Sequence, residues 1–345
     1  MDSLKKSTSG TALNKSSGSL KKSTSGNALS SSSSKVDVVV HDYIAAQPGE
    51  VKHTVKTSSG ELACYLRMGE NSEHVELPFI VTYHDLGTNH VSCFSPFFGQ
   101  PAMKTVLPFI NILHIEAPGH EYNSADIENH YPSLEQMSQD ILYVLDHFKI
   151  KTFIGLGSGA GSAVLTKFAI NNPKYVIGLI LVGSALKSFG WLETVKHWIG
   201  FKSIPSFKNP ENVKNYLIKH FHLGELDTTS PDIMQSIINE MNMINTVNMC
   251  HYVESYLKKD DINLNDIHGL KCKILVVVGK DDVHVDDVIE LFSHFNPSLS
   301  TLITIPECGA LVTVEKPYDL IEPFKLYMQG LGFLLDYYQS IGDEE

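Results

Sequence analysis

The sequence lacks several features that would assign it quickly to a class of protein. It has no run of about 18 consecutive apolar residues, the length that a helix needs to cross a bilayer. Its N-terminal segment has no apolar stretch of the kind that directs secretion. The five cysteines are scattered without Cys-x-x-Cys spacing, which argues against both a zinc site and a disulfide framework. These absences predict a soluble, cytoplasmic protein with reduced thiols.

Positive charge is scarce outside the first 35 residues. The chain has a formal net charge of −12 at pH 7, yet residues 1–35 hold six lysines against Asp2 alone. This segment therefore carries +5, and the rest of the chain carries −17. Because an acidic body repels phosphate backbones, we expect no nucleic-acid partner.

Residues 3–34 contain a near-repeat with a 16-residue period, SLKKSTSGTALNKSSG followed by SLKKSTSGNALSSSSS. So few apolar groups cannot offset the entropy of ordering the backbone, and residues 1–35 are predicted to be a disordered tail. The serines and threonines beside lysine pairs suggest a phosphorylatable tether, or a weak electrostatic contact with a membrane. A mitochondrial transit role is disfavoured because the tail contains no arginine.

From about residue 36 the pattern is that of a folded α/β domain, predicted to span residues 36–335. A hairpin whose Ser-Ser-Gly turn ends at Gly60 comes first. It is followed by strands that are apolar at consecutive positions, as expected when both faces of a parallel sheet are covered. Helical patterns alternate with these strands, and Ser133 with Gln136 has the spacing of a capping box. The predicted buried strands are 77–85, 109–119, 151–157, 176–183, 271–279 and 300–306.

Residues 185 to about 262 interrupt this alternation with a helical pattern rich in methionine and tryptophan. We expect an inserted helical cap over the C-terminal ends of the strands, where α/β folds bind their ligands. Its methionine and aromatic side chains fit either an ordinary cap core or an adaptable binding surface. Beyond the domain, residues 336–345 form a short acidic end.

The stretch FIGLGSGAG, residues 153–161, joins a predicted strand to a predicted helix through a cluster of glycines. A dinucleotide-binding loop fits it only loosely, because the stretch does not open the first βαβ unit and no acidic residue closes the following strand. The nucleophile elbow of α/β hydrolases, Gly-x-Ser-x-Gly, fits better. That frame places Gly159, or Gly157 when shifted by two, where the nucleophile should stand.

The other parts of a hydrolase site can be located from the chain order nucleophile, acid, histidine. The turn after the strand 271–279 supplies Asp282 as the acid, whereas Ala310 occupies the position of the histidine. In the turn that should form the oxyanion hole, Asp85 replaces a glycine and brings negative charge, which weakens the hole. A site without nucleophile and base cannot run acyl transfer, so Gly159, Asp282 and Ala310 are predicted to be vestigial triad positions.

Several of these segments resemble the hallmark segments of the N-myc downstream-regulated (NDRG) family. They are TYHDLGTNH (82–90), HIEAPGHE (114–121), YPSLEQM (131–137), IGLGSGAG (154–161), FAINNP (168–173) and ECGALV (307–312). The resemblance covers about residues 36–330. It implies an α/β-hydrolase fold, with a mostly parallel central sheet, helices on both faces and an inserted helical cap, that lacks hydrolytic activity. It also implies a cytosolic protein associated with signal transduction, stress response, differentiation and vesicle traffic.

Two features depart from the family pattern. The acid Asp282 is retained where family members often lack it, and the repeats stand at the N-terminus, whereas some relatives carry repeats in a C-terminal tail. Regulation through such a tail therefore cannot be carried over to this chain.

The residues leave two functions open. The first is a non-enzymatic signalling or adaptor protein that engages protein partners, or a small molecule of unknown class, through the former cleft or the acidic face. The candidate cleft residues are His84, Asp85, Asn89, Glu116, His120 and Ser158. The second is an esterase-like hydrolase with a relocated nucleophile, Ser158 or Ser162, and with His84 or His120 as its base. Ser158 stands one residue before the elbow apex, and so tight a turn would point its side chain elsewhere, which favours the first function.

No cofactor and no metal site are predicted. The chain has 16 histidines, but His220-x-His222 and Asp281-Asp282-Val283-His284 repeat no known spacing of metal ligands. Surface histidines are the simpler reading of this composition.

Overall fold

The computed structural model describes residues 49–70, 76–128, 130–184, 209–220, 231–260 and 262–334. All of them belong to the second of two units into which the chain divides, Val39–Glu345. The predicted tail 1–35, much of the cap segment, and the acidic end 336–345 lie outside the described residues. No helix in the described part of the chain is both long and apolar enough to cross a membrane.

The described chain begins with the predicted hairpin. Strands β1 (Val51–Thr57) and β2 (Gly60–Arg67) pair antiparallel, with Thr57 opposite Gly60. The Thr57 hydroxyl donates a hydrogen bond to the Gly60 carbonyl across the turn at 2.9 Å. Gly60 has a φ of 132°, a conformation that residues with a Cβ rarely adopt.

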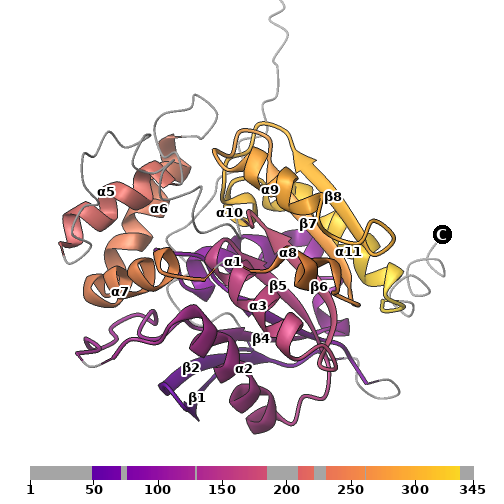
Figure 1. Ribbon diagram of the computed structural model, residues 1–345, viewed down its shortest axis with the longest axis horizontal. Helices are drawn as coiled ribbons and strands as arrows, with labels where there is room; N and C mark the ends of the chain where they lie inside the picture. The colour runs from indigo at the N-terminus through magenta and orange to yellow at the C-terminus, as the bar shows by residue number, and fades with distance from the viewer. Residues whose placement is uncertain are drawn as a thin grey trace, which may run out of the picture. The chain divides into compact units, whose positions relative to one another are not determined.

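One eight-stranded sheet organises the fold, in the order β1-β2-β4-β3-β5-β6-β7-β8 (Figure 1). Strand β2 runs antiparallel to β4, and all pairs from β4 to β8 are parallel. The parallel strands are β3 (Phe79–Tyr83), β4 (Asn111–Ile115), β5 (Phe153–Ser158), β6 (Val176–Val182), β7 (Lys273–Gly279) and β8 (Ser300–Ile305). The central strands are buried along nearly their whole length, as their continuous apolar runs predict.

Helices cover both faces of the sheet. One core cluster joins the strand side chains Val81 and Leu113 to helices α2 (Leu134–Phe148), α3 (Ala160–Asn171) and α9 (Val285–Phe292). The other joins Ile80 and Ile112 to helices α1 (His90–Phe98) and α11 (Ile321–Gly330). The remaining short elements are α8 (Leu264–His268), α10 (Val312–Glu315), η2 (Pro101–Met103), η3 (Leu107–Phe109) and η4 (Pro317–Leu320).

Helix α2 begins where its sequence predicts. The Ser133 hydroxyl accepts the Gln136 N–H, and the Gln136 side chain accepts the Ser133 N–H, which makes a complete capping box. Met137, Ile141 and Leu145 then follow on the buried face. The helix ends at Lys149, whose φ of 57° closes it in the left-handed conformation.

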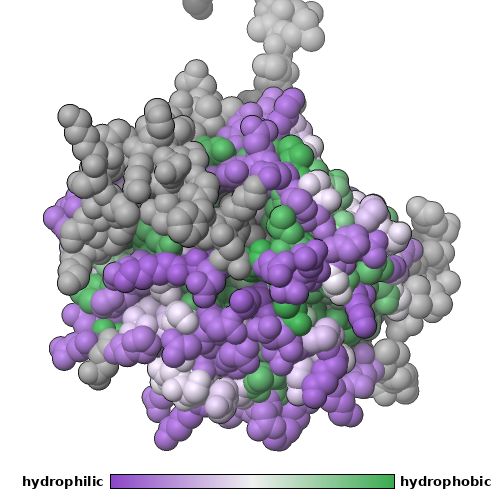
Figure 2. Space-filling model, viewed as in Figure 1, coloured by the Kyte–Doolittle hydropathy of each residue, from purple (hydrophilic) through white to green (hydrophobic). Residues whose placement is uncertain are grey.

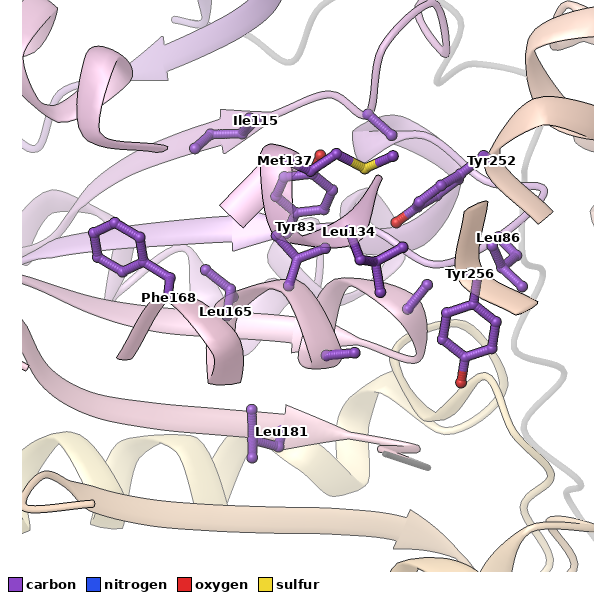
Figure 3. Close-up of a cluster of buried hydrophobic side chains, with 14 of the residues drawn as sticks. Tyr83, Leu86, Ile115, Leu134, Met137, Leu165, Phe168, Leu181, Tyr252 and Tyr256 are labelled. Atoms are coloured by element: carbon purple, nitrogen blue, oxygen red, sulfur yellow. The ribbon is translucent and has the colours of Figure 1, made fainter. Parts of the chain in front are cut away.

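The described part of the cap segment is helical, as predicted. It comprises α5 (Pro210–His220), α6 (Pro231–Met243) and α7 (Thr246–Leu257), which Figure 1 shows grouped together on one side. Helix α7 is the most deeply packed: Tyr252 and Tyr256 are buried, and Figure 3 shows them beside Leu86, at the carboxyl end of β3. Trp191, Trp198 and Phe201 lie outside the described residues. The described surface in the view of Figure 2 is mostly hydrophilic.

Candidate functional site

The turn between β5 and α3 has the conformation of a nucleophile elbow with glycine at its apex. Gly159 lies between the two elements with φ of 48° and ψ of −111°, in the left-handed region that favours glycine. Its N–H donates to the Val182 carbonyl at 2.8 Å, which ties the turn to β6. A Cβ at Gly161 would lie 1.9 Å from the Tyr83 carbonyl oxygen, so glycine is what lets α3 pack this closely on β3. Gly157 stands inside β5, not at the turn.

The carboxylate of Asp85 occupies the place of an oxyanion. Its Oδ1 accepts the N–H of Leu86 at 2.7 Å and the N–H of Ala160 at 2.8 Å. In hydrolases of this kind the oxyanion hole is made by the N–H after the nucleophile and an N–H from the loop after β3. Ala160 and Leu86 hold those two positions. Asp85 therefore fills the hole with its own oxygen, where the sequence had predicted only a charge nearby.

The same carboxylate also occupies the space of a nucleophile. A Cβ built on Gly159 would lie 2.0 Å from Asp85 Oδ1 and 2.1 Å from Oδ2. A serine at the apex would therefore force the Asp85 carboxylate out of its present position. The glycine and the aspartate form one complementary pair.

Burial raises the pKa of Asp85, and the two backbone N–H bonds only partly offset it, so the pKa is about 6. The charge of His84 also lowers the pKa of Asp85, whereas the negative charge of Asp282 raises it. Among the described residues no lysine or arginine forms an ion pair with Asp85. The site thus holds a carboxyl group whose charge is poorly compensated.

The other two triad positions meet at the end of β6. Asp282 is buried after β7, and its Oδ1 accepts the N–H of His284 at 2.9 Å. Burial raises the pKa of Asp282. A Cβ on Gly183 would lie 3.8 Å from Asp282 Oδ2 and 3.2 Å from the Ala310 carbonyl oxygen, which places both residues beside this glycine. Position 310 carries a methyl group and offers no imidazole.

The loop of Ala310 is held by a carboxylate from the helix that follows it. Glu315 accepts the N–H of Gly309 through Oε2 and the N–H of Leu311 through Oε1, both at 3.0 Å. Hydrogen bonds from the backbone N–H groups on both sides of Ala310 therefore fix the conformation of the loop.

The two serines considered as relocated nucleophiles are both buried. Ser158 ends β5 on the side of Ile154 and Leu156, where its hydroxyl has no hydrogen-bond partner among the described residues. Ser162 donates to the Val182 carbonyl at 3.2 Å. Within the described part of the chain neither hydroxyl is hydrogen-bonded to an imidazole, the arrangement that would activate it.

A chain of buried carboxylates and imidazoles lies on the α1 side of the sheet. Glu116, directly after β4, accepts the backbone N–H of His90 at 3.1 Å and contacts Nδ1 of the same residue through the same oxygen. Glu50 lies 3.7 Å from His90 Nε2 and 3.4 Å from His114 Nε2. The Thr82 hydroxyl lies 2.6 Å from His114 Nδ1 and continues the chain along the sheet. Tyr65 stacks on His90 with 4.0 Å between ring centroids.

Burial and pairing set the protonation of this network. Burial alone would lower the pKa of His90, but the charge and hydrogen bonds of Glu116 and Glu50 outweigh it and raise the pKa to about 9. For Glu50, burial is outweighed by His114 and His90, which lower its pKa to about 2. Glu116 has a lowered pKa because His90 and His84 outweigh its burial. Burial, with the charge of His90, lowers the pKa of His114. At neutral pH, therefore, His90 is protonated, and Glu50 and Glu116 are ionised.

The remaining candidate residues mostly bond to the protein itself. The His84 Nδ1–H donates to the Asp85 carbonyl at 2.9 Å, and Nε2 lies 2.9 Å from the Ala117 nitrogen and 3.0 Å from Glu116 Oε2. Asn89 is the N-cap of α1 and accepts the Ser92 N–H. His120 Nδ1–H donates to the Pro118 carbonyl at 3.1 Å, whereas its Nε2 has no hydrogen-bond partner in the described residues. Burial lowers the pKa of His120 to about 3.

All six candidate cleft residues are buried, at 3% exposure or less. His84, Asp85, Glu116 and His120 lie at the carboxyl ends of β3 and β4, and Ser158 ends β5 on the α1 side of the sheet. Glu50, His90 and His114 also belong to the site, although none of them was predicted from the sequence. The alternation of His114 and Glu116 along β4 could have marked a polar row inside an apolar strand, but Glu50 reaches it only through tertiary structure.

Among the residues that the structure describes, no group of three or more His, Cys, Asp or Glu side chains is arranged to hold a metal ion. Asp282 and His284 are joined through a backbone N–H. The side chains of His220 and His222 lie outside the described residues.

The chain is similar to known proteins over most of its length. A model of the Ndr family matches residues 52–335. An NDRG-like protein of Dictyostelium discoideum is 51% identical over 336 residues, which cover 97% of this chain and 99% of that protein. Protein NDRG3 of Xenopus laevis is 30% identical over 295 residues, covering 82% of this chain and 76% of that protein.

Among solved structures, a thermophilic esterase from Thermogutta terrifontis matches with a TM-score of 0.64 and 14% identity, covering 81% of this chain and 99% of that one. An identity this low shows the fold alone, and it confirms the expected α/β-hydrolase fold. The family match and the identity over nearly the whole length then decide the assignment: the chain belongs to the Ndr family.

Proposed function

We propose that this protein is a catalytically silent hydrolase-fold protein that acts by binding other proteins. The observation that carries the proposal is the position of Asp85, whose carboxylate fills the oxyanion hole and the nucleophile space together. An oxyanion hole accelerates acyl transfer only when it is free to receive the developing charge of the substrate. A hole whose two N–H groups already bind a carboxylate cannot bind the oxyanion of a substrate.

The apex and the base position support the same proposal. Gly159 has no side chain to attack a carbonyl, and Ala310 has none to accept a proton. The retained Asp282 cannot replace either group, since in a triad the acid only orients the histidine. The strand, turn and helix around Gly159 are still closely packed, so the elbow serves the fold even without chemistry.

Membership of the Ndr family extends the proposal to a role. We infer a cytoplasmic adaptor in signal transduction and stress response, with a part in vesicle traffic, whose partners are proteins. The acidic domain and the basic tail carry charges of opposite sign, which gives the protein two electrostatically distinct ways to meet a partner. The tail would add a weak contact with anionic membranes.

The experiment is hydrolysis of p-nitrophenyl esters and thioesters by the purified full-length protein, beside Ser158→Ala and Ser162→Ala. We expect no turnover above buffer for any of them, with circular dichroism reporting an intact fold. Turnover by the natural sequence that disappears with one of the two serines would overturn the proposal and establish a relocated nucleophile.

A further inference from the structure

Strand β8 is a free edge of the sheet among the described residues. It stands at the end of the strand order and pairs only with β7. The N–H of Ile274 donates to the Leu299 carbonyl at 2.7 Å, and the N–H of Lys280 donates to the Ile305 carbonyl at 2.8 Å. Because alternate residues of a parallel strand face the same neighbour, the odd-numbered residues from 299 to 305 bond to β7. The N–H and C=O groups of Ser300, Leu302 and Thr304 therefore point away from the sheet.

This edge lacks the features that usually prevent strand pairing. Residues 295–306 contain no charged side chain, whereas β1, at the opposite edge, carries Lys52 and Lys56. Natural sheets protect their edges with charges, with lysine above all, with proline inside the strand, or with bulges. The prolines at 297 and 306 stand outside β8 and leave its six residues able to pair. One edge of this sheet is protected and the other is not.

We propose that β8 pairs antiparallel with β8 of a second copy of this chain, around a two-fold axis at Leu302. In that register Ser300 of one copy stands opposite Thr304 of the other, and Leu302 stands opposite itself. The outward residues are then hydrogen-bonded pairs, so three N–H groups from each copy make six hydrogen bonds. The strand is self-complementary, as a two-fold interface requires.

Charge makes a second copy the best occupant of this edge. The chain carries a net charge of −12, so two copies repel each other over most of their surfaces. Along the uncharged segment 295–306 the paired strands themselves place no like charges opposite each other. The Ser300 hydroxyl donates to the Asn296 carbonyl at 2.9 Å, and its oxygen can accept from the exposed Thr304 hydroxyl of the other copy. One strand buries less area than a standard interface, so the dimer forms only as concentration rises.

The test is sedimentation velocity of the full-length protein from low to high micromolar concentration, with two double variants. Ser300→Lys with Thr304→Lys sets lysines against each other across the pair, and Ser300→Glu with Thr304→Glu does the same with carboxylates. We expect the natural sequence to reach twice the mass of one chain, each double variant alone to stay at the mass of one chain, and their equimolar mixture to recover the doubled mass. Recovery in the mixture shows that both variants fold. Thr54→Lys on β1 is the matched control and should dimerise like the natural sequence.

Two results would overturn the proposal. One is the mass of a single chain at every concentration, which would mean that β8 pairs with another segment of this chain or with a different protein. The other is a doubled mass that persists in both double variants, which would place the contact elsewhere on the surface.

Discussion

At the scale of single residues, the position of the Asp85 side chain depends on the absence of a side chain at Gly159. The glycine leaves the space into which the aspartate projects, and the aspartate accepts hydrogen bonds from the N–H groups of Leu86 and Ala160. Neither residue alone accounts for the site. A Ser-His-Asp triad at these positions would therefore need both to change, together with Ala310.

This coupling predicts the behaviour of variants that rebuild the triad. The double variant Gly159→Ser/Ala310→His should not hydrolyse p-nitrophenyl esters, because Asp85 still fills the hole and collides with the new serine. Adding Asp85→Gly frees both N–H donors and should give turnover at least about tenfold above the double variant, since one such donor is worth on the order of 10²-fold or more. Esterase assays on folded double and triple variants provide the measurement. Equal activity of the two would contradict the role assigned to Asp85.

The raised pKa of Asp85 predicts a gain in stability from Asp85→Asn. The pKa is 3.8 in the unfolded reference and about 6 in the fold, so the charge opposes folding. Its cost is absent below pH 3.8, grows as pH rises to about 6, and is complete above that. At pH 7 we expect Asp85→Asn to raise the free energy of unfolding by about 2 to 3 kcal/mol, because the amide oxygen can still accept both N–H bonds.

Urea unfolding at pH 4 and pH 7 measures this effect. The gain at pH 7 should nearly vanish at pH 4, whereas the exposed control Asp146→Asn should change little at either pH. A gain that is the same at both pH values would show that charge is not its cause.

At the scale of elements, Asn248 fastens cap helix α7 to the loop after β4. Its Nδ2 donates to the carbonyls of Gly119 at 3.0 Å and Ala125 at 2.9 Å, and its Oδ1 accepts the N–H of Ile127 at 2.9 Å. Gly119 permits this contact, since a Cβ there would lie 2.2 Å from Asn248 Nδ2. One side chain thus satisfies three backbone groups of an irregular loop.

Asn248→Ala should loosen this attachment, because three backbone groups lose their partners at once. We expect a loss of about 2 to 4 kcal/mol in the free energy of unfolding, at roughly 1 kcal/mol or more for each lost bond. Amide hydrogen exchange should increase in residues 117–127 and in α7, with little change in β5. Asn239→Ala, on the exposed face of α6, is the control. Faster exchange spread evenly over the sheet would contradict a local role.

At the scale of the whole molecule, the buried ionic network links the start of β1 to β4 and α1 through Glu50, Glu116 and His90. His90 has a pKa of 6.5 in the unfolded reference and about 9 in the fold. Its contribution to stability is therefore complete below pH 6.5 and is lost as pH rises through 9. From pH 7 to pH 10 we expect the free energy of unfolding to fall by about 2 to 3 kcal/mol on account of this residue.

Chemical unfolding at several pH values from 7 to 10 tests this dependence. His90→Gln should be less stable at pH 7, since it removes the cation that the buried Glu50 and Glu116 share, and should show a flatter profile above pH 7. The exposed His147→Gln should keep the profile of the natural sequence. A profile for His90→Gln that parallels the natural one would assign the alkaline loss to other groups.

Local patterns in the sequence determined much of this molecule. Consecutive apolar residues predicted the buried parallel strands because burial on both faces leaves no room for polar alternation. Capping and turn chemistry predicted the start of α2 and the hairpin at Gly60, because such signals act within a few residues. The order of motifs along the chain also predicted three vestigial triad positions, Gly159, Asp282 and Ala310.

Only the tertiary structure decided what the site contains. From the sequence, Asp85 only brought a negative charge to the turn. Its role depends on the N–H groups of Leu86 and Ala160, which are 74 residues apart in the chain. Glu50 meets His90 and His114 only because β1 folds against β2 and β2 pairs with β4. Hydrogen bonds and ion pairs between distant segments leave no period or spacing in the sequence, whereas helices and strands do, because their contacts recur every few residues.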